Sequence, residues 1–139
     1  MATMRRIMLA LLVIFMIGTA ADLMLLDHHE GPGQLIPLVL LTLGLIVSAW
    51  TLGGRAAAIT TMRIVMVLFV AAGFLGMAMH YNGNREFQHE MDPSLAGWPL
   101  FMKIITSKAP PALAPASMIQ MGLLGLLYTY RHPAVRRSL

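Results

Sequence analysis

The sequence predicts an all-α membrane protein, a bundle of four transmembrane helices with a long, partly helical outer loop between the third and the fourth. Of its 139 residues, 58% are hydrophobic and only 12% are charged, which is more apolar surface than a soluble domain of this size can bury. The apolar residues form four long runs, and a helix of about 20 residues spans the ~30 Å hydrocarbon core of a bilayer. Basic residues lie unevenly around these runs, which predicts an orientation.

The four runs predict a single membrane domain over residues 1–139. We expect its spans over residues 6–26, 35–53, 60–81 and 113–130, and the outer loop over 82–112. Pro37 suits the first turn of the second span, where a missing N–H costs nothing, and Gly53-Gly54 ends that span. Asn82-Gly83 is expected to stop the third span.

The first run has an alternative interpretation as a secretory signal peptide. Its features are the paired Arg5 and Arg6, an apolar stretch and small residues before Asp22. Cleavage near Ala20 or Ala21 would leave three spans with the same topology. We expect an uncleaved helix and therefore four spans.

The distribution of basic residues predicts that both termini are cytoplasmic. On the predicted inner side lie Arg5, Arg6, Arg55, Arg63, Arg131, Arg136 and Arg137, and on the outer side only Arg85, Lys103 and Lys108. Positively charged segments remain in the cytoplasm, and an even number of spans places both ends on one side. We therefore expect a bacterial inner-membrane protein whose arginines contact the lipid bilayer. Nucleic acid is not an expected partner, because no basic residues alternate with aromatic ones on a soluble surface.

The outer loop is too long to lack structure in a compact protein, and it predicts two short helices. Asn84 can cap a first helix over residues 85–91, and Pro99 can begin a second that runs to about Ser107. Apolar residues of the second helix recur at the spacing of one helical face: Trp98, Phe101, Met102 and Ile105. This pattern predicts a helix that lies in the membrane surface or over the bundle.

Histidines and carboxylates gather on the predicted outer side, where they suggest a metal site. The candidate ligands are His28, His29, His80, Glu86, His89 and Glu90. In a helix, Glu86, His89 and Glu90 share one face, and imidazole and carboxylate suit Zn²⁺ or Cu²⁺. The alternative interpretation is a set of interfacial polar residues that bind no metal.

Asp22 lies about one turn inside the outer end of the first span. An ionisable group at this depth is costly and usually faces a partner or a cavity. His80 lies at a similar depth in the third span, so we predict an intramembrane Asp22–His80 pair. Such a pair would fix helix packing or take up a proton or cation.

Other cofactors are less well supported by the sequence. The absence of cysteine excludes disulfides and iron–sulfur ligation. Haem or chlorophyll ligation is disfavoured, because only His80 is placed within a span. The 13 methionines are scattered through the spans and suit core filling better than a copper site. A divalent metal is the leading cofactor hypothesis.

Three hypotheses for function remain. The first is a non-catalytic accessory subunit of a larger membrane complex, which the small size and the small residues on helix faces favour: Ala49, Gly53, Ala72, Gly76, Gly122 and Gly125. The second is a cation-binding or transport protein that uses the outer cluster. The third is a membrane enzyme acting at the outer interface. This last hypothesis needs a nucleophile, and no motif surrounds Ser94, Ser107 or Ser117.

Overall fold

The computed structural model describes residues 2–27, 31–107 and 113–136, which form helices joined by turns. In chain order the helices are α1 (Ala2–Leu25), α2 (Pro32–Thr51), α3 (Ala56–Met91), α4 (Gly97–Ile105), α5 (Leu113–Thr129) and α6 (Pro133–Arg136). The described residues contain no strand, so the predicted all-α class is confirmed.

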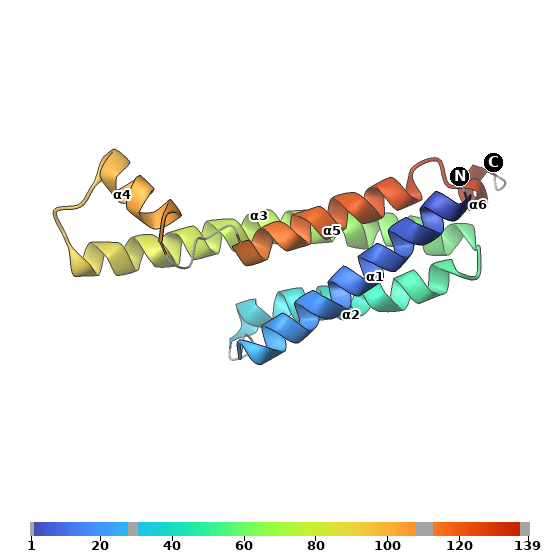
Figure 1. Ribbon diagram of the computed structural model, residues 1–139, viewed down its shortest axis with the longest axis horizontal. Coiled ribbons are helices and arrows are strands. Elements are labelled where there is room, and N and C mark those ends of the chain that lie inside the picture. The colour runs from blue at the N-terminus through green and yellow to red at the C-terminus, as the bar shows by residue number, and fades with distance from the viewer. Residues whose placement is uncertain (1, 28–30, 108–112, 137–139) are drawn as a thin grey trace.

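Four long helices pack side by side. The helix α3 packs against α2 and α5, and α1 packs against the same two helices, so the four form a closed ring whose most extensive contact joins α3 to α5. Both chain termini lie at one end of this bundle (Figure 1). We call it the arginine end, because Arg5 and Arg63 lie there, and we call the opposite end, which carries α4, the hairpin end.

Three of the described helices are long and apolar enough to cross a membrane: Thr3–Leu25, Gly33–Thr51 and Ala56–Met91. Their outward faces carry large apolar side chains, for example Ile14 and Ile46, which are 62% and 60% exposed. Apolar surface on this scale is typical of helices surrounded by lipid rather than water. The structure is therefore consistent with a multi-pass membrane protein.

The helix α3 differs most from the prediction. It runs without a break through Asn82-Gly83, so the predicted stop at this dipeptide is wrong, and the predicted helix over 85–91 is its last part. A glycine inside a helix costs only about 1 kcal/mol, and the residues that follow are good helix formers. Pro93 supplies the stronger signal, because the residue before a proline avoids the helical region, and Asp92 is extended.

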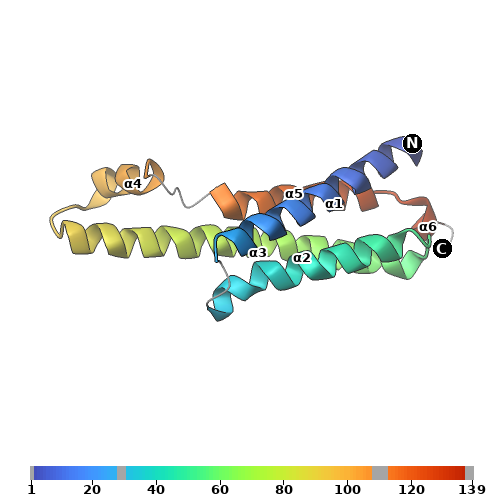
Figure 2. The same cartoon turned by 60° about the horizontal axis from the view of Figure 1, so that its bottom comes forward.

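The full length of α3 exceeds the thickness of a bilayer. Its 36 residues rise by about 54 Å, against ~30 Å for a hydrocarbon core. Figure 2 shows α3 extending well past the ends of the neighbouring helices, with α4 folded back along the extension. The second predicted loop helix is thus present, as α4, and it packs on α3 instead of standing alone.

Glycines allow α3 and α5 to approach closely. A methyl group at Gly122 would lie 2.7 Å from the carbonyl oxygen of Met66, and one at Gly73 would lie 2.7 Å from that of Pro115. The two helices therefore touch backbone to backbone, which is the role of small residues in membrane bundles. Of the small residues on helix faces, Gly122 thus packs within the chain, whereas Gly53 is exposed.

Side chains of α1 and α3 converge on the C-terminal end of α5. Arg5 of α1 donates hydrogen bonds to the carbonyl oxygens of Tyr128 and, at 2.8 Å, Tyr130. Arg63 of α3 donates to the carbonyl of Thr129 at 2.8 Å. The last carbonyls of a helix have no partner within it, and cations are stabilising at a helix C-terminus. The Thr129 carbonyl also accepts from the His132 N–H at 3.2 Å. Arg5 and Arg63, which the sequence assigned to lipid contact, thus cap α5.

The same turn is tied to α2 and carries His132. The buried Tyr128 donates from its hydroxyl to Thr51 Oγ1 at 3.2 Å. The His132 ring lies 5.5 Å from the Tyr128 ring, and its Nδ1 accepts a hydrogen bond from the Ala134 N–H at 3.3 Å. Burial lowers the pKa of His132 below its usual value of 6.5, and the charges of Arg5 and Arg63 lower it further.

A Gly122→Ala substitution should lower the stability of the bundle. The added methyl would meet backbone atoms of α3, which cannot move aside, so we expect a loss of about 1–3 kcal/mol. The melting temperature in detergent measures the effect. The control is Gly18→Ala in α1, where nothing lies within 4 Å. Equal melting temperatures for the two variants would contradict the close α3–α5 contact.

Acidification should destabilise the arginine end through His132. Because the folded chain takes up this proton at a lower pH than the unfolded chain, stability is lost as the pH falls from about 6.5 through the lowered pKa. Once protonated, the His132 Nδ1 can no longer accept the hydrogen bond from the Ala134 N–H. Melting temperatures between pH 7.5 and 5 should therefore decline less in His132→Gln than in the wild type. An identical decline in both proteins would rule out this assignment.

Candidate functional site

The predicted metal ligands on α3 lie along one continuous helix. His80 precedes Glu86 by six residues and His89 by nine, which separates them by about 9 and 14 Å along the helix axis. Glu86, His89 and Glu90 are exposed on the part of α3 that extends beyond the bundle. His80 instead lies level with the ends of the other helices. The unbroken helix therefore keeps His80 away from the other three.

The remaining predicted ligands, His28 and His29, lie outside the described residues. Among the residues that the structure does describe, no three histidine or carboxylate side chains come together as a metal site. A metal site that includes His28 or His29 stays a prediction.

A cavity of about 440 Å³ lies at the hairpin end, among α1, α2, α3 and α5. Most of its lining is apolar or small, with Leu23, Met79 and Met118 as the larger side chains. Its polar lining consists of Thr19, Gln34, His80 and Asn84. This volume falls within the range of about 300–1,000 Å³ for small-molecule pockets, which often lie between the helices of a bundle.

The face of α3 explains why the cavity exists. Ala72, Gly76, His80 and Asn84 recur every four residues and so form one stripe, to which Gly83 is adjacent. Gly76 lies against Pro115 of α5, where a methyl group would be 3.2 Å from the proline Cβ. Around Gly83 nothing lies within 4 Å of an added methyl, so the space widens there.

The structure places the two residues of the predicted Asp22–His80 pair in different surroundings. His80 lines the cavity, whereas α1 contributes Thr19 and Leu23 to the lining. Asp22 is exposed and does not line the cavity. The pairing stays a prediction, and in the structure His80 lines the same cavity as Gln34 and Asn84.

A tight turn joins α3 to α4. The Asp92 carboxylate accepts hydrogen bonds from the hydroxyl of Ser94 at 2.6 Å and from its backbone N–H at 3.1 Å. These bonds lower the pKa of Asp92, as do the nearby charges of Lys103 and His89. Gly97 adopts a φ of +59°, which reverses the chain into α4. We call the extension of α3 over residues 82–91, this turn and α4 the hairpin.

The side of α4 that packs on α3 is not the apolar face that the sequence predicted. Leu100 and Ile104 are 9% and 0% exposed and form its buried side, while Phe101 lies 6.3 Å from the Tyr81 ring of α3. Trp98 stacks on Phe101 at 5.2 Å and is still 69% exposed. Apolar residues occur around most of this short helix, so spacing alone did not identify the side that packs.

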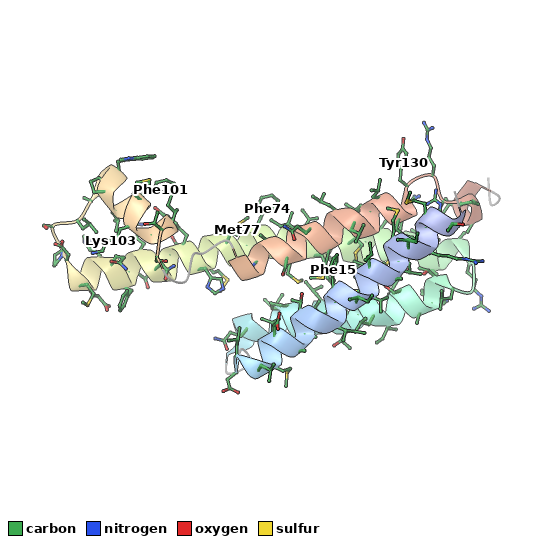
Figure 3. All side chains as sticks on the ribbon, viewed as in Figure 1. Phe15, Phe74, Met77, Phe101, Lys103 and Tyr130 are labelled. Carbon is green, nitrogen blue, oxygen red and sulfur yellow. The ribbon has the colours of Figure 1, made fainter. Side chains whose placement is uncertain are left out.

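An apolar surface therefore remains uncovered on the hairpin. It consists of Trp98, Met102 and Ile105 on α4, with Phe87 and Met91 exposed on α3. Figure 3 shows Phe101 and Lys103 on α4, beyond the ends of α1 and α2. The sequence predicted an apolar stripe here, but the position of this surface depends on the unbroken α3.

Comparisons with known protein families, curated proteins and solved structures found no match to this chain. The two features that geometry identifies are the cavity and the apolar surface of the hairpin. Neither follows from a motif. The signal that could have indicated the cavity is the stripe of small residues on α3, which ends in His80 and Asn84.

Substituting the buried contact of α4 should release it from α3. An Ile104→Ala change leaves a cavity in the only part of α4 that is fully buried, and such changes cost about 2–5 kcal/mol. Hydrogen exchange over residues 97–105 should become much faster. Ile105→Ala is the matched control, because Ile105 is 38% exposed. Equal exchange in the two variants would show that α4 is not held through Ile104.

Proposed function

We propose that the protein is a non-catalytic accessory subunit of a larger complex in a bacterial inner membrane. The observation that carries the proposal is the hairpin, which extends past the bundle and exposes Trp98, Met102 and Ile105. In this proposal the exposed surface binds the part of another membrane subunit that protrudes from the bilayer.

The proposed orientation places four spans in the membrane and the hairpin outside the cell. Both termini lie at the arginine end, which supports an even number of crossings. The fourth span is α5, whose 17 residues rise by about 26 Å, with a few neighbouring residues completing the crossing. The excess of arginine at that end supports a cytoplasmic location for it.

The polarity of the α3 extension supports a location of the hairpin outside the hydrocarbon. Residues 82–90 include Arg85, Glu86 and Glu90, which are costly in the bilayer interior. In water, however, the exposed Trp98 and its neighbours are unfavourable. Covering apolar surface contributes about 25 cal/mol per Å², and tryptophan is prominent among the residues that dominate binding energies.

The proposal predicts that Trp98 is needed for a defined complex. After extraction in a mild detergent, the wild type should elute with a partner at fixed stoichiometry and with a mass well above that of one chain. Trp98→Ala should reduce the retained partner at least tenfold. Trp50→Ala is the matched control, since Trp50 is also exposed, at 41%, but lies near the arginine end of α2.

Two results would contradict the subunit proposal. One is a wild-type chain that is stable alone in mild detergent, with no partner of fixed stoichiometry. The other is a complex that both tryptophan variants lose or both retain, because the hairpin would then not be the binding surface.

A further inference from the structure

We propose that the cavity at the hairpin end binds a neutral amphiphile, a molecule with an apolar body and an uncharged head that carries carbonyl or hydroxyl groups. The inference does not depend on the proposed subunit role, which concerns the hairpin surface. Its basis is the combination of volume, apolar walls and several polar groups in one partly open space between four helices.

The described lining of the cavity carries no formal charge from arginine, lysine, aspartate or glutamate. An anionic headgroup would have no cationic partner there, and burying an unpaired charge is strongly unfavourable. The basic residues Arg5 and Arg63 lie at the opposite end and already bind carbonyls of α5. The described lining therefore favours an uncharged ligand.

The polar side chains of the cavity can bind the head of the ligand. Gln34 and Asn84 carry amide groups, each with two N–H donors and one acceptor oxygen. Thr19 adds a hydroxyl, and His80 adds ring nitrogens that can donate or accept. Each amide can hold an existing hydrogen bond and still offer a further donor to a ligand. Carbonyl and hydroxyl oxygens are the groups that such a set recognises.

The apolar walls of the cavity can bind the body of the ligand. Leu23, Met79 and Met118 provide flexible apolar walls, and methionine adapts to irregular shapes. Thr19 lies six residues before the end of α1, so the cavity extends about 9 Å into the bundle. This inner part of the cavity lies between apolar helices. It therefore suits the apolar body of a ligand that partitions into the membrane. Quinones and neutral glycerides share this chemistry.

The test is a titration of the purified full chain in detergent micelles with decylubiquinone and, separately, with monooleoylglycerol. Isothermal titration calorimetry gives the affinity, and a rise in melting temperature confirms binding to the folded state. Saturable binding of either probe supports the proposal. Comparing the two titrations shows whether the cavity prefers a quinone or a glyceride head. Phosphatidylglycerol serves as the anionic comparison and should not compete.

Gly83→Leu and Gly18→Leu form a matched pair. Both glycines lie within helices and have nothing within 4 Å of an added Cβ, but only Gly83 lines the cavity. Gly83→Leu should fill the space and weaken binding at least tenfold, whereas Gly18→Leu should bind as the wild type does. Melting temperatures without probe show that both variants fold.

A second variant tests the polar groups separately from the volume. Asn84→Leu should weaken binding of the neutral probe at least fivefold while the protein remains folded. The proposal is overturned if the wild type shows no saturable binding of either neutral probe. It is also overturned if Gly83→Leu and Gly18→Leu bind equally, or if phosphatidylglycerol displaces the neutral probe.

Discussion

The length of α3 is the constraint on which the rest of the structure depends. A single helix of 36 residues, about 54 Å, is too long for one bilayer crossing, so it divides into a part that packs in the bundle and a part that extends from it. The first part joins α2 and α5, and the second part carries α4. A break at Asn82-Gly83 would have separated these two roles.

At the arginine end, the structure resolves a problem that every helix end poses in an apolar medium. The last carbonyls of α5 lack partners within the helix, and an unsatisfied carbonyl costs several kcal/mol in hydrocarbon. Arg5 and Arg63 supply the donors from two other helices. Two residues whose charge predicts topology thus also join the helices, and His132 responds to their charge.

Much of the fold could be predicted because a membrane helix can be recognised from the hydropathy of its own residues. Long apolar runs predicted the all-α class and the approximate positions of the long helices. A metal site that includes His28 or His29 stays a prediction, because these residues lie outside the described ones. The course of α3 was predicted less well, since Asn82-Gly83 was expected to end a helix that instead continues to Met91. A weak local stop of about 1 kcal/mol does not outweigh good helix formers beside it and the packing of α4 on the extension.

The sequence by itself predicted long apolar helices, because hydropathy over some 20 residues is a local property, and three of the described helices are long and apolar enough to cross a membrane. It also determined the small residues that allow close packing. Only the tertiary structure decided which glycine faces a neighbouring backbone and which faces open space, as for Gly122 and Gly83. That distinction depends on the relative positions of separate helices, and it creates both the tight α3–α5 contact and the cavity.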